Sequence, residues 1–318
     1  MFTVMTWNVE NLFLPEDPDG PSQAAYDQKI TGLAKTINQQ APDAVGLQEV
    51  GNPAALNDLV TALGGTWHQQ VSVHPDSRGI RVAWLTTRPI TGPAEITDFP
   101  ALLRPVQVDD DGTTLGRLGR GALAITVTTD TGFAVRLITA HLKSKLLTFP
   151  GGRFNTRDEG ERARFAAYAL ARRAGEATAL RAALTDALDG HGQQRPVVLT
   201  GDLNDTVQAA TTQLLQGPPG SEIKTGGFNK DDNGDGMRMW NLAPHMPAGR
   251  DYSRNNSGRK ELIDHILVSH SLVKPLTAVT AHAVVDEPLA PANPADPATR
   301  RNKPTSDHAP VVARFADL

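Results

Sequence analysis

Short polar motifs at the ends of apolar segments constrain this chain more than any other feature. Five segments, spread from Asn8 to His308, offer an Asn, Asp, Glu or His where an apolar, β-branched run ends. Loops at the ends of packed strands can bring side chains from distant parts of a sequence together. The pattern therefore predicts one site assembled from the whole chain. The segments are residues 6–11, 47–50, 139–144, 199–205, and 262–265 together with 306–308.

Length and composition permit this arrangement and restrict its chemistry. A chain of 318 residues can bury roughly three quarters of its unfolded surface in one large domain. We find no linker and predict a single domain over residues 1–318. The sequence has no cysteine, which excludes disulfides, thiolate metal sites and a cysteine nucleophile. Catalysis or metal binding must therefore use oxygen and imidazole groups.

The N-terminal residues alternate as a strand does, without the basic and apolar regions of a signal peptide. No stretch approaches the roughly 18 uninterrupted apolar residues of a transmembrane helix, so we expect a cytoplasmic protein without a transmembrane segment. The net charge of −4 does not identify a partner, because a basic patch can exist under a mildly acidic total.

Periodicity predicts an irregular alternation of strands and helices. Apolar residues at helical spacing predict helices over 27–40 and 53–63, and a long helix from a capping box at 156–159 to Gly190. Most Arg residues of the long helix are predicted to form a solvated face and not a nucleic-acid-binding stripe. Residues 98–119 and 288–304 are predicted to be surface excursions. Predicted strands are 43–50, 67–73, 80–86, 121–128, 133–141, 196–200, 263–268, 279–285 and 311–315, with a hairpin turn at 130–132.

The polar residues themselves suggest a chemistry. Asp202 and Asn204 project to the same side if strand geometry continues through them. Asp307 and His308 are adjacent before a strand, and Glu49 ends an apolar run. Carboxylate and amide oxygens without cysteine favour a hard ion such as Mg²⁺ or Mn²⁺. A divalent ion, a water held by Asp and two His residues are the components of phosphoester hydrolysis.

Each of these residues also has a structural interpretation. His141 and His308 could each be a hydrogen-bonded structural residue, and Asn8 a turn residue. Asp202 could cap a helix that starts near Thr206. Five polar strand ends in one chain are nevertheless hard to explain as unrelated caps.

Taken together, these residues resemble the endonuclease/exonuclease/phosphatase superfamily. This group includes DNase I, the exonuclease III type apurinic endonucleases, sphingomyelinases and inositol polyphosphate 5-phosphatases. The resemblance rests on Gly-Asp-Leu-Asn at 201–204 and Ser-Asp-His at 306–308, with Gln-Glu at 48–49 and Trp-Asn at 7–8 as weaker signals. It spans residues 6–312 and implies a four-layer α/β sandwich, in which two mixed β-sheets pack face to face with helices outside.

The resemblance also implies roles for individual residues. Asn8 and Glu49 would bind Mg²⁺, with Asp307 as an additional ligand and Mn²⁺ as a substitute ion. Asp202 would orient or deprotonate the attacking water, and Asn204 would hydrogen-bond a phosphate oxygen.

Four further residues complete the implied site. His141 and His308 would stabilise the transition state or assist the leaving oxygen, and Asp264 would orient one of the two imidazoles. Which His pairs with which Asp stays open. Arg120 and Lys143 are candidate phosphate contacts, or alternatively solvent-facing charges without a role.

The superfamily acts on DNA, RNA, lipid headgroups and inositol phosphates, so its fold does not name a substrate. We expect a nuclease, because residues 141–145 resemble the corresponding segment of bacterial nucleases in this superfamily. A lipid or small-molecule phosphodiesterase is the main alternative, and a catalytically inactive binding module is another. We expect a monomer with a phosphodiester substrate, DNA or RNA among the candidates, and infer no protein partner.

One acidic segment lies outside this set. Residues 231–236 match the first half of a calcium-binding loop, but the twelfth position is Leu242 where a bidentate Glu should stand. We therefore predict a flexible acidic loop and not an EF-hand.

Overall fold

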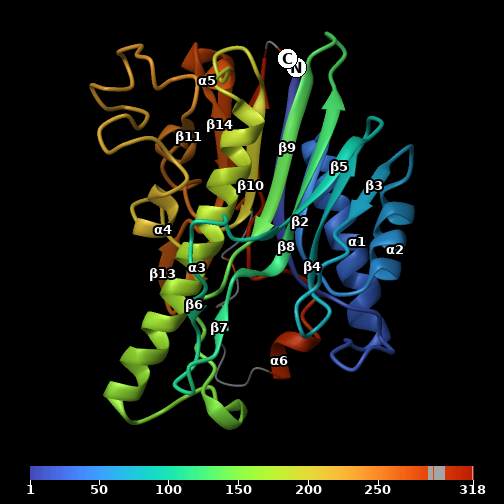
Figure 1. Ribbon diagram of the computed structural model, residues 1–318. Coiled ribbons are helices and arrows are strands. Elements are labelled where there is room, and N and C mark those ends of the chain that lie inside the picture. The colour runs from blue at the N-terminus through green and yellow to red at the C-terminus, as the bar shows by residue number, and fades with distance from the viewer. Residues whose placement is uncertain (286–288, 290–297, 317) are drawn as a thin grey trace.

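Two six-stranded mixed β-sheets pack face to face in this computed structural model (Figure 1). The structure describes residues 1–285, 289, 298–316 and 318. The first sheet has the strand order β15–β16–β1–β2–β4–β3 and the second β11–β14–β10–β9–β8–β5. β1 pairs in parallel with β2, and β10 with β9, whereas the other neighbours are antiparallel.

The strand bounds follow the sheet order. The first sheet contains β15 (Val279–Ala283), β16 (Val311–Phe315), β1 (Phe2–Leu12), β2 (Ala44–Val50), β4 (Arg81–Thr86) and β3 (His68–Val71). The second contains β11 (Met239–Asn241), β14 (Asp264–Ser269), β10 (Val197–Asp202), β9 (Ala134–His141), β8 (Arg117–Thr128) and β5 (Thr91–Asp98). Two small hairpins pair β6 (Val106–Gln107) with β7 (Thr114–Leu115) and β12 (Arg254–Asn256) with β13 (Arg259–Glu261).

Helices cover the outer faces of both sheets (Figure 1). α1 (Gln23–Gln40) and α2 (Pro53–Leu63) lie on the first sheet, and α3 (Glu159–Leu188) on the second. The predicted four-layer sandwich is therefore confirmed. The short helices are α4 (Ala210–Gln213), α5 (His270–Val273) and α6 (Ala298–Arg301), with 3₁₀ turns η1 (Pro150–Gly152), η2 (Ala243–His245) and η3 (Leu276–Ala278).

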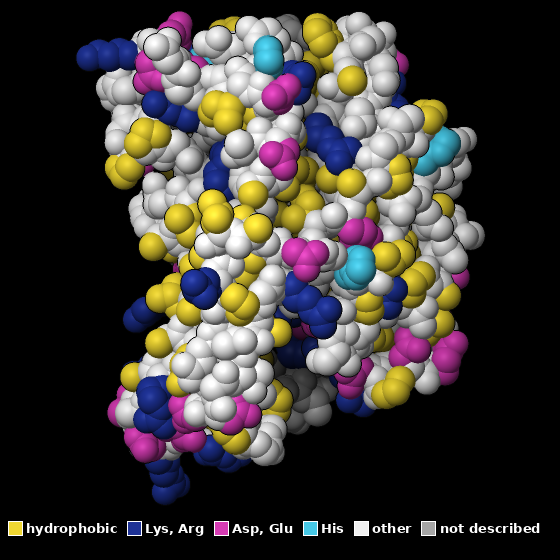
Figure 2. Space-filling view, viewed as in Figure 1, with side chains coloured by type: hydrophobic (Ala, Val, Ile, Leu, Met, Phe, Trp, Pro, Cys, Tyr) yellow, Lys and Arg dark blue, Asp and Glu magenta, His cyan; other side chains and the backbone are white. Residues whose placement is uncertain are grey.

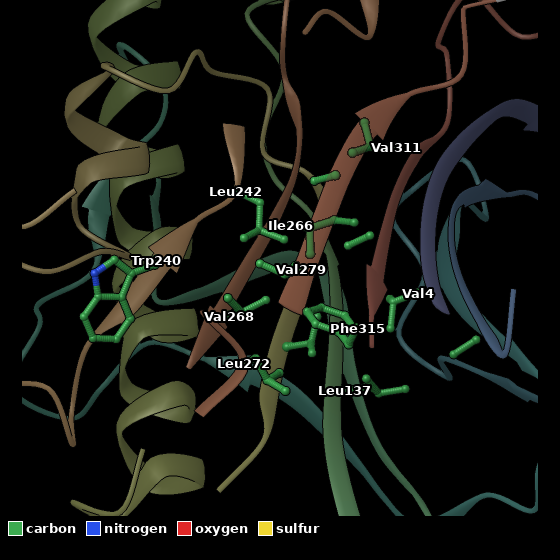
Figure 3. Close-up of a cluster of buried hydrophobic side chains, with 14 of the residues drawn as sticks. Val4, Leu137, Trp240, Leu242, Ile266, Val268, Leu272, Val279, Val311 and Phe315 are labelled. Carbon is green, nitrogen blue, oxygen red and sulfur yellow. The ribbon is translucent and has the colours of Figure 1, made fainter. Parts of the chain in front are cut away.

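The central core lies between the sheets, because strand alternation sends every second side chain inward. Figure 3 shows part of it, where Val4 and Phe315 of the first sheet lie near Leu137 and Val268 of the second. The other face of each sheet packs its apolar side chains against helices, as Leu47 of β2 does against α1 and α2. Each sheet is thus buried on both faces, which explains the nearly continuous apolar runs in the sequence.

Local signals set several boundaries as predicted. α2 matches its predicted range, since Asn52 caps its N-terminus by accepting from the Ala54 N–H and Gly64 follows its end. β16 also matches, and a turn joins β8 to β9. α1 begins earlier than predicted, at Gln23, because Ser22 caps it.

Other predictions were wrong. α3 begins at Glu159 and not at a capping box of Thr156, because the carboxylate of Asp158 accepts from the Gly160 and Glu161 N–H groups. Most of its Arg residues are exposed or half-buried as predicted, and Arg173 is a buried exception. No helix starts near Thr206; within the described residues the next helix is α4.

The two predicted surface excursions have different outcomes. Residues 98–119 contain the β6–β7 hairpin and the first residues of β8, which was predicted to begin only at residue 121. Sequence patterning also did not predict β5, which forms the edge of the second sheet. Of residues 288–304, the segments 288 and 290–297 lie outside the described residues, and α6 forms within the remainder.

Candidate active site

The candidate site is the polar end of the layer between the two sheets. Along β10, alternation places Val198, Thr200 and Asp202 on the same face, and Val198 belongs to the central core. The same order, from apolar to Thr to a polar group, recurs in β1 (Val4, Thr6, Asn8) and β9 (Leu137, Thr139, His141). The site residues thus continue the inward-facing rows of the core, and they are buried.

A glycine brings the sheets close together just before the site. A Cβ added to Gly46 would lie 2.7 Å from Oγ1 of Thr200 and 2.9 Å from Oγ1 of Thr139 in the opposite sheet. Gln48, two residues further, donates from Nε2 to Oγ1 of Thr139 at 2.9 Å. This close approach brings the end of β2, with Glu49, to the second sheet.

A second glycine sets the approach of β9 to β10. Gly201 has φ 147°, and a Cβ there would lie 2.0 Å from the carbonyl oxygen of Ala140. The pairing register then places Asp202 opposite His141 on one side and opposite Asp264 on the other. Three neighbouring strands therefore present their polar groups side by side.

Asp202 lies at the centre of the site. Its Oδ2 accepts a hydrogen bond from Nδ2 of Asn8 at 3.0 Å, and lies 3.5 Å from Nε2 of His141 and 4.0 Å from Nε2 of His308. Its Oδ1 accepts from the backbone N–H of Asn204 at 2.9 Å. One carboxylate therefore connects residues from four separate segments of the sequence.

His308 and Asp264 form the shortest pair in the site, with 2.7 Å between Nδ1 and Oδ2. Burial opposes a charge on His308, but Asp264, Asp307 and Asp202 outweigh it and raise the pKa of the imidazole to about 10. His308 is thus cationic at neutral pH. His308, and not His141, is therefore the imidazole that contacts Asp264.

The other two titrating groups shift in ways that separate their roles. Burial, and secondly the charge of Asp264, raise the pKa of Asp202 to about 7. Burial, together with the charges of Arg120 and His308, lowers the pKa of His141 well below its usual value, so this imidazole is neutral. Nδ1 of His141 has no hydrogen-bond partner among the residues described.

Glu49 and Asn204 occupy strained backbone positions. Glu49 has φ 63° and Asn204 φ 54°, in the left-handed region that residues other than Gly rarely adopt, although Asn tolerates it better than Glu does. Glu49 accepts from Nδ2 of Asn8 at 3.1 Å and from the N–H of Asn11 at 3.0 Å. Asn204 donates from Nδ2 to the carbonyl of Leu142 at 3.0 Å. Such strain is typical of side chains held in place for function.

The donor set fits a hard divalent cation. Glu49, Asp202, Asp264 and Asp307 place four carboxylates in one connected network, and oxygen donors of this type suit Mg²⁺. Ligand atoms of Asp202, Asp264 and His308 lie within 4.8 Å of one another. Burial is the largest cause of the raised pKa of Asp202 and the charge of Asp264 is the second, and a nearby cation would oppose both.

The cluster of Asp202, Asp264 and His308 differs from the predicted ligand set of Asn8, Glu49 and Asp307. Asn8 turns its NH₂ group toward the carboxylates, while its Oδ1 accepts from the N–H of Glu10 at 2.9 Å. Asp307 joins the site through its Oδ1, 3.9 Å from Nε2 of His308. All eight predicted catalytic and metal residues therefore lie in one contact network: Asn8, Glu49, His141, Asp202, Asn204, Asp264, Asp307 and His308.

The two predicted phosphate contacts already have partners within the chain. Arg120 donates from Nε to Oδ2 of Asp76 at 2.9 Å. Lys143 donates from Nζ to the carbonyls of Ser144 at 3.1 Å and Leu146 at 2.7 Å. Burial, followed by the charge of Arg172, lowers the pKa of Lys143 to about 8.

Sequence reasoning missed Glu10, which supports Asp307. Its Oε2 accepts from the N–H of Asp307 at 3.1 Å and forms an ion pair with Arg300, and its carbonyl accepts from Nζ of the buried Lys29. Glu10 lies two residues after Asn8 in the same strand, and this spacing could have indicated that it belongs near the site.

It also missed two residues of α3 that fix the loop after His141. Glu176 accepts from the N–H of Lys143 at 2.6 Å. Arg173 donates to the carbonyl of Lys143 at 3.0 Å and to Oδ2 of Asp205 at 3.1 Å. Both are buried charged residues on a helix whose buried face is otherwise largely apolar. Charged residues within that apolar face were the sequence signal that could have identified them.

The acidic segment 231–236 forms a separate cluster. Asp231, Asp235 and His270 place ligand atoms within 4.8 Å of one another. Arg238 forms an ion pair with Asp235 at 3.4 Å, and Nζ of Lys274 lies 3.7 Å from Asp231, so cations of the chain already balance these acids.

Comparison with known proteins agrees with this geometry. The model of the endonuclease/exonuclease/phosphatase family matches residues 5–308. The chain belongs to this family. It is therefore a phosphoric ester hydrolase of a group that typically depends on a divalent metal. A comparison with curated protein sequences finds no match.

Solved structures of this family share the fold over nearly the whole chain. A mannosyl-6-phosphatase of Bacteroides thetaiotaomicron aligns with 99% of each chain at 16% identity and a TM-score of 0.57. The human Nocturnin catalytic domain aligns over 99% of this chain and 93% of its own, at 17% identity and TM-score 0.52. Truncated Caenorhabditis elegans TDP2 aligns over 99% of this chain and 96% of its own, at 16% identity and a TM-score of 0.52.

Within the described part of the chain, none of the helices combines the length and the apolarity that crossing a membrane requires.

Proposed function

We propose that this chain is a Mg²⁺-dependent phosphodiester hydrolase that acts as a nuclease. The observation that carries the proposal is the position of Asp202, which lies between Asn8, His141 and His308 with one carboxylate. A site that hydrolyses a phosphodiester needs a group to orient water and cations to face the phosphate. Asp202 and His308 supply these two functions side by side.

Glu49 and Asn8, with Asp307, hold the ion in this proposal. A bound Mg²⁺ would neutralise phosphate charge and favour the pentacoordinate transition state. Asn8 would offer the ion its Oδ1, which in this structure accepts from the N–H of Glu10 at 2.9 Å.

Asp202 orients the attacking water and accepts its proton. Its pKa of about 7 suits a general base at neutral pH. His308, held cationic by Asp264, stabilises charge on the phosphoryl oxygens or protonates the leaving oxygen. His141 is neutral and donates a hydrogen bond without carrying charge. Asn204 hydrogen-bonds a phosphate oxygen.

Two observations support a nuclease. Residues 141–145 resemble the corresponding segment of bacterial nucleases. Figure 2 shows a hollow in the lower half of the molecule, with Lys and Arg side chains at its edge, at the end toward which β9 and β10 run in Figure 1. Cations at such a position attract a phosphate backbone.

A small-molecule phosphodiesterase is the second candidate, because several cations near the site already have acidic partners. Arg120 pairs with Asp76 at 2.9 Å, and Lys145 with Asp205 at 3.0 Å. Paired cations attract a long polyanion less strongly than free ones do. A compact substrate that reaches only the centre of the site fits this arrangement.

A hydrolysis panel tests the proposal. Wild type and Asp202→Asn are compared, with Mg²⁺ or with EDTA, on plasmid DNA, RNA, sphingomyelin, inositol phosphates and bis(4-nitrophenyl) phosphate. We expect Mg²⁺-dependent cleavage of nucleic acid by wild type alone. Turnover of only the chromogenic or headgroup substrates would favour the second candidate. Equal activity of wild type and Asp202→Asn would overturn the mechanism.

A further inference from the structure

A cavity of about 410 Å³ adjoins the catalytic residues at Asn204. We propose that it binds the part of the substrate beside the scissile phosphate, with Arg254 binding a second phosphate and Phe154 contacting a planar ring. This combination of ring and second phosphate is the chemistry of a nucleotide unit. The inference rests on the proposed phosphodiester hydrolase function.

Arg254 is the residue that carries the inference. It belongs to β12, lines the cavity and is half-buried. Its Nε is buried without a hydrogen-bond partner, and it forms no ion pair with any residue that the structure describes. A buried guanidinium N–H without an acceptor is costly, so a substrate oxygen that accepts from Nε of Arg254 gains binding energy.

The backbone holds Arg254 next to the catalytic residues. Arg254 forms an isolated β-bridge with His308, and the neighbouring Ser253 carbonyl accepts from the N–H of Ala309 at 2.7 Å. Ser253 also accepts, through Oγ, from the N–H of Asp264 at 3.1 Å. The β12–β13 hairpin is thus anchored to both members of the His308–Asp264 pair.

The other cations of the cavity lining are already paired. Lys145 contacts Asp205 at 3.0 Å, and Arg162 contacts Glu159 at 2.6 Å. Among the described lining residues, Arg254 is therefore the cation that remains available to an anion. Glu261, which faces Arg254 across the hairpin, instead accepts from Nδ2 of Asn256 at 3.3 Å.

The cavity lining is partly aromatic. Phe149 lines the cavity, is buried, and packs against Phe165 at 5.0 Å between ring centroids. Phe154 lines the cavity but keeps 65% of its surface exposed. Leu146 beside it is 57% exposed. An exposed aromatic ring at the edge of a cavity is suited to stack on a planar group.

The cavity volume of about 410 Å³ can accommodate one nucleotide unit. Pockets for ligands of this class hold about 300 to 1,000 Å³. Since Asn204 both lines the cavity and lies in the catalytic network, a substrate can place its scissile phosphate near Asp202 and its neighbouring unit in the cavity. Two sources share this chemistry, the end of a nucleic-acid strand and a free nucleotide diester.

Calorimetry tests binding independently of turnover. A nucleoside 3′,5′-bisphosphate is titrated, with Mg²⁺ present, into wild type, Arg254→Gln and Arg259→Gln. Arg259 is a matched control, because it is exposed in the same hairpin and does not line the cavity. We expect Arg254→Gln to weaken binding by about 10- to 100-fold and the control to bind as wild type does.

Kinetics test the same contact during hydrolysis. For a 5′-phosphorylated dinucleotide, Arg254→Gln should raise KM by about 10- to 100-fold with little change in kcat. For bis(4-nitrophenyl) phosphate, which has no second phosphate, KM should stay near the wild-type value. Phe154→Ala should raise KM for both substrates by about 5- to 100-fold, since both contain rings. The control Phe133→Ala, at an exposed Phe that does not line the cavity, should leave KM unchanged.

The outcomes separate the two proposals. Weaker bisphosphate binding together with a raised KM for the dinucleotide assigns the cavity to the end of a strand, and weaker bisphosphate binding alone assigns it to a free nucleotide. Equal binding of the bisphosphate by wild type and Arg254→Gln overturns the inference. If no phosphodiester is hydrolysed, the proposed function fails, and calorimetry still decides whether the cavity binds a nucleotide.

Discussion

Nδ1 of His308 lies 2.7 Å from Oδ2 of Asp264, although 44 positions separate the two residues. Both groups are buried, and the second oxygen of Asp264 has no hydrogen-bond partner in the described part of the chain. Asp264 contributes most to keeping His308 charged, and Asp307 and Asp202 add to its effect. A buried imidazole that would otherwise be neutral stays cationic next to the catalytic Asp202 of the proposed mechanism.

Asp264→Asn should lower the pKa of His308. Because Asp264 raises that pKa, removing its charge moves the loss of the imidazolium proton to lower pH. The alkaline limb of the kcat/KM profile should shift to lower pH, and the rate at its optimum should fall by about 100- to 10,000-fold. The measurement is a pH–rate profile on a chromogenic diester with Mg²⁺.

Asp251→Asn is the control for this prediction, because Asp251 is an exposed Asp outside the contact network. Its profile should match wild type. An unchanged alkaline limb in Asp264→Asn would mean that the titrating proton belongs to another group, and the role of Asp264 would be withdrawn.

Glu49→Gln and Asp202→Asn should respond differently to Mg²⁺. Glu49→Gln keeps the shape of the side chain but removes a charge that offsets the ion, so high Mg²⁺ should restore part of the activity. Asp202→Asn removes the base that accepts the water proton, so added Mg²⁺ should not restore activity. Initial rates over a Mg²⁺ titration check both variants, and full wild-type activity in excess EDTA would contradict the metal requirement.

Gly201→Ala should destabilise the fold and inactivate the enzyme. The new Cβ would lie 2.0 Å from the carbonyl oxygen of Ala140, and the φ of 147° is unfavourable for Ala. We expect a loss on the order of 3 kcal/mol in the free energy of unfolding, measured by urea denaturation. Gly226→Ala is the matched control, since a Cβ there meets nothing within 4 Å, and it should unfold as wild type does. Equal midpoints for both variants would show that β10 can move away from β9.

Arg173→Met should destabilise the protein through Asp205. Arg173 is buried and contacts Oδ2 of Asp205 at 3.1 Å, so its removal leaves a largely buried carboxylate with less compensation. The expected loss is about 3 to 5 kcal/mol. On the same helix, the exposed Arg164, which pairs with Asp110, provides the control Arg164→Met, with no measurable change in the urea midpoint. A similar small effect for both would show that Lys145 alone balances Asp205.

Short-range signals determined a large part of this structure. The strand alternation of residues 198–202 determines that Thr200 and Asp202 share the face of Val198, and this follows from backbone geometry within one strand. The bounds of α2 follow from Asn52, Pro53 and Gly64, because caps act within one turn of helix. Motifs such as Gly201 to Asn204 identify the family for the same reason, since they need only neighbouring residues.

The tertiary structure alone decided which of these groups meet. The register that places Asp202 between His141 and Asp264 depends on pairing between strands distant in sequence. The contact of Asp264 with His308, and the position of Arg254 beside them, depend on the packing of one sheet on the other. Local periodicity predicts the face on which a side chain lies, whereas its partner is decided by the summed contacts of the whole chain.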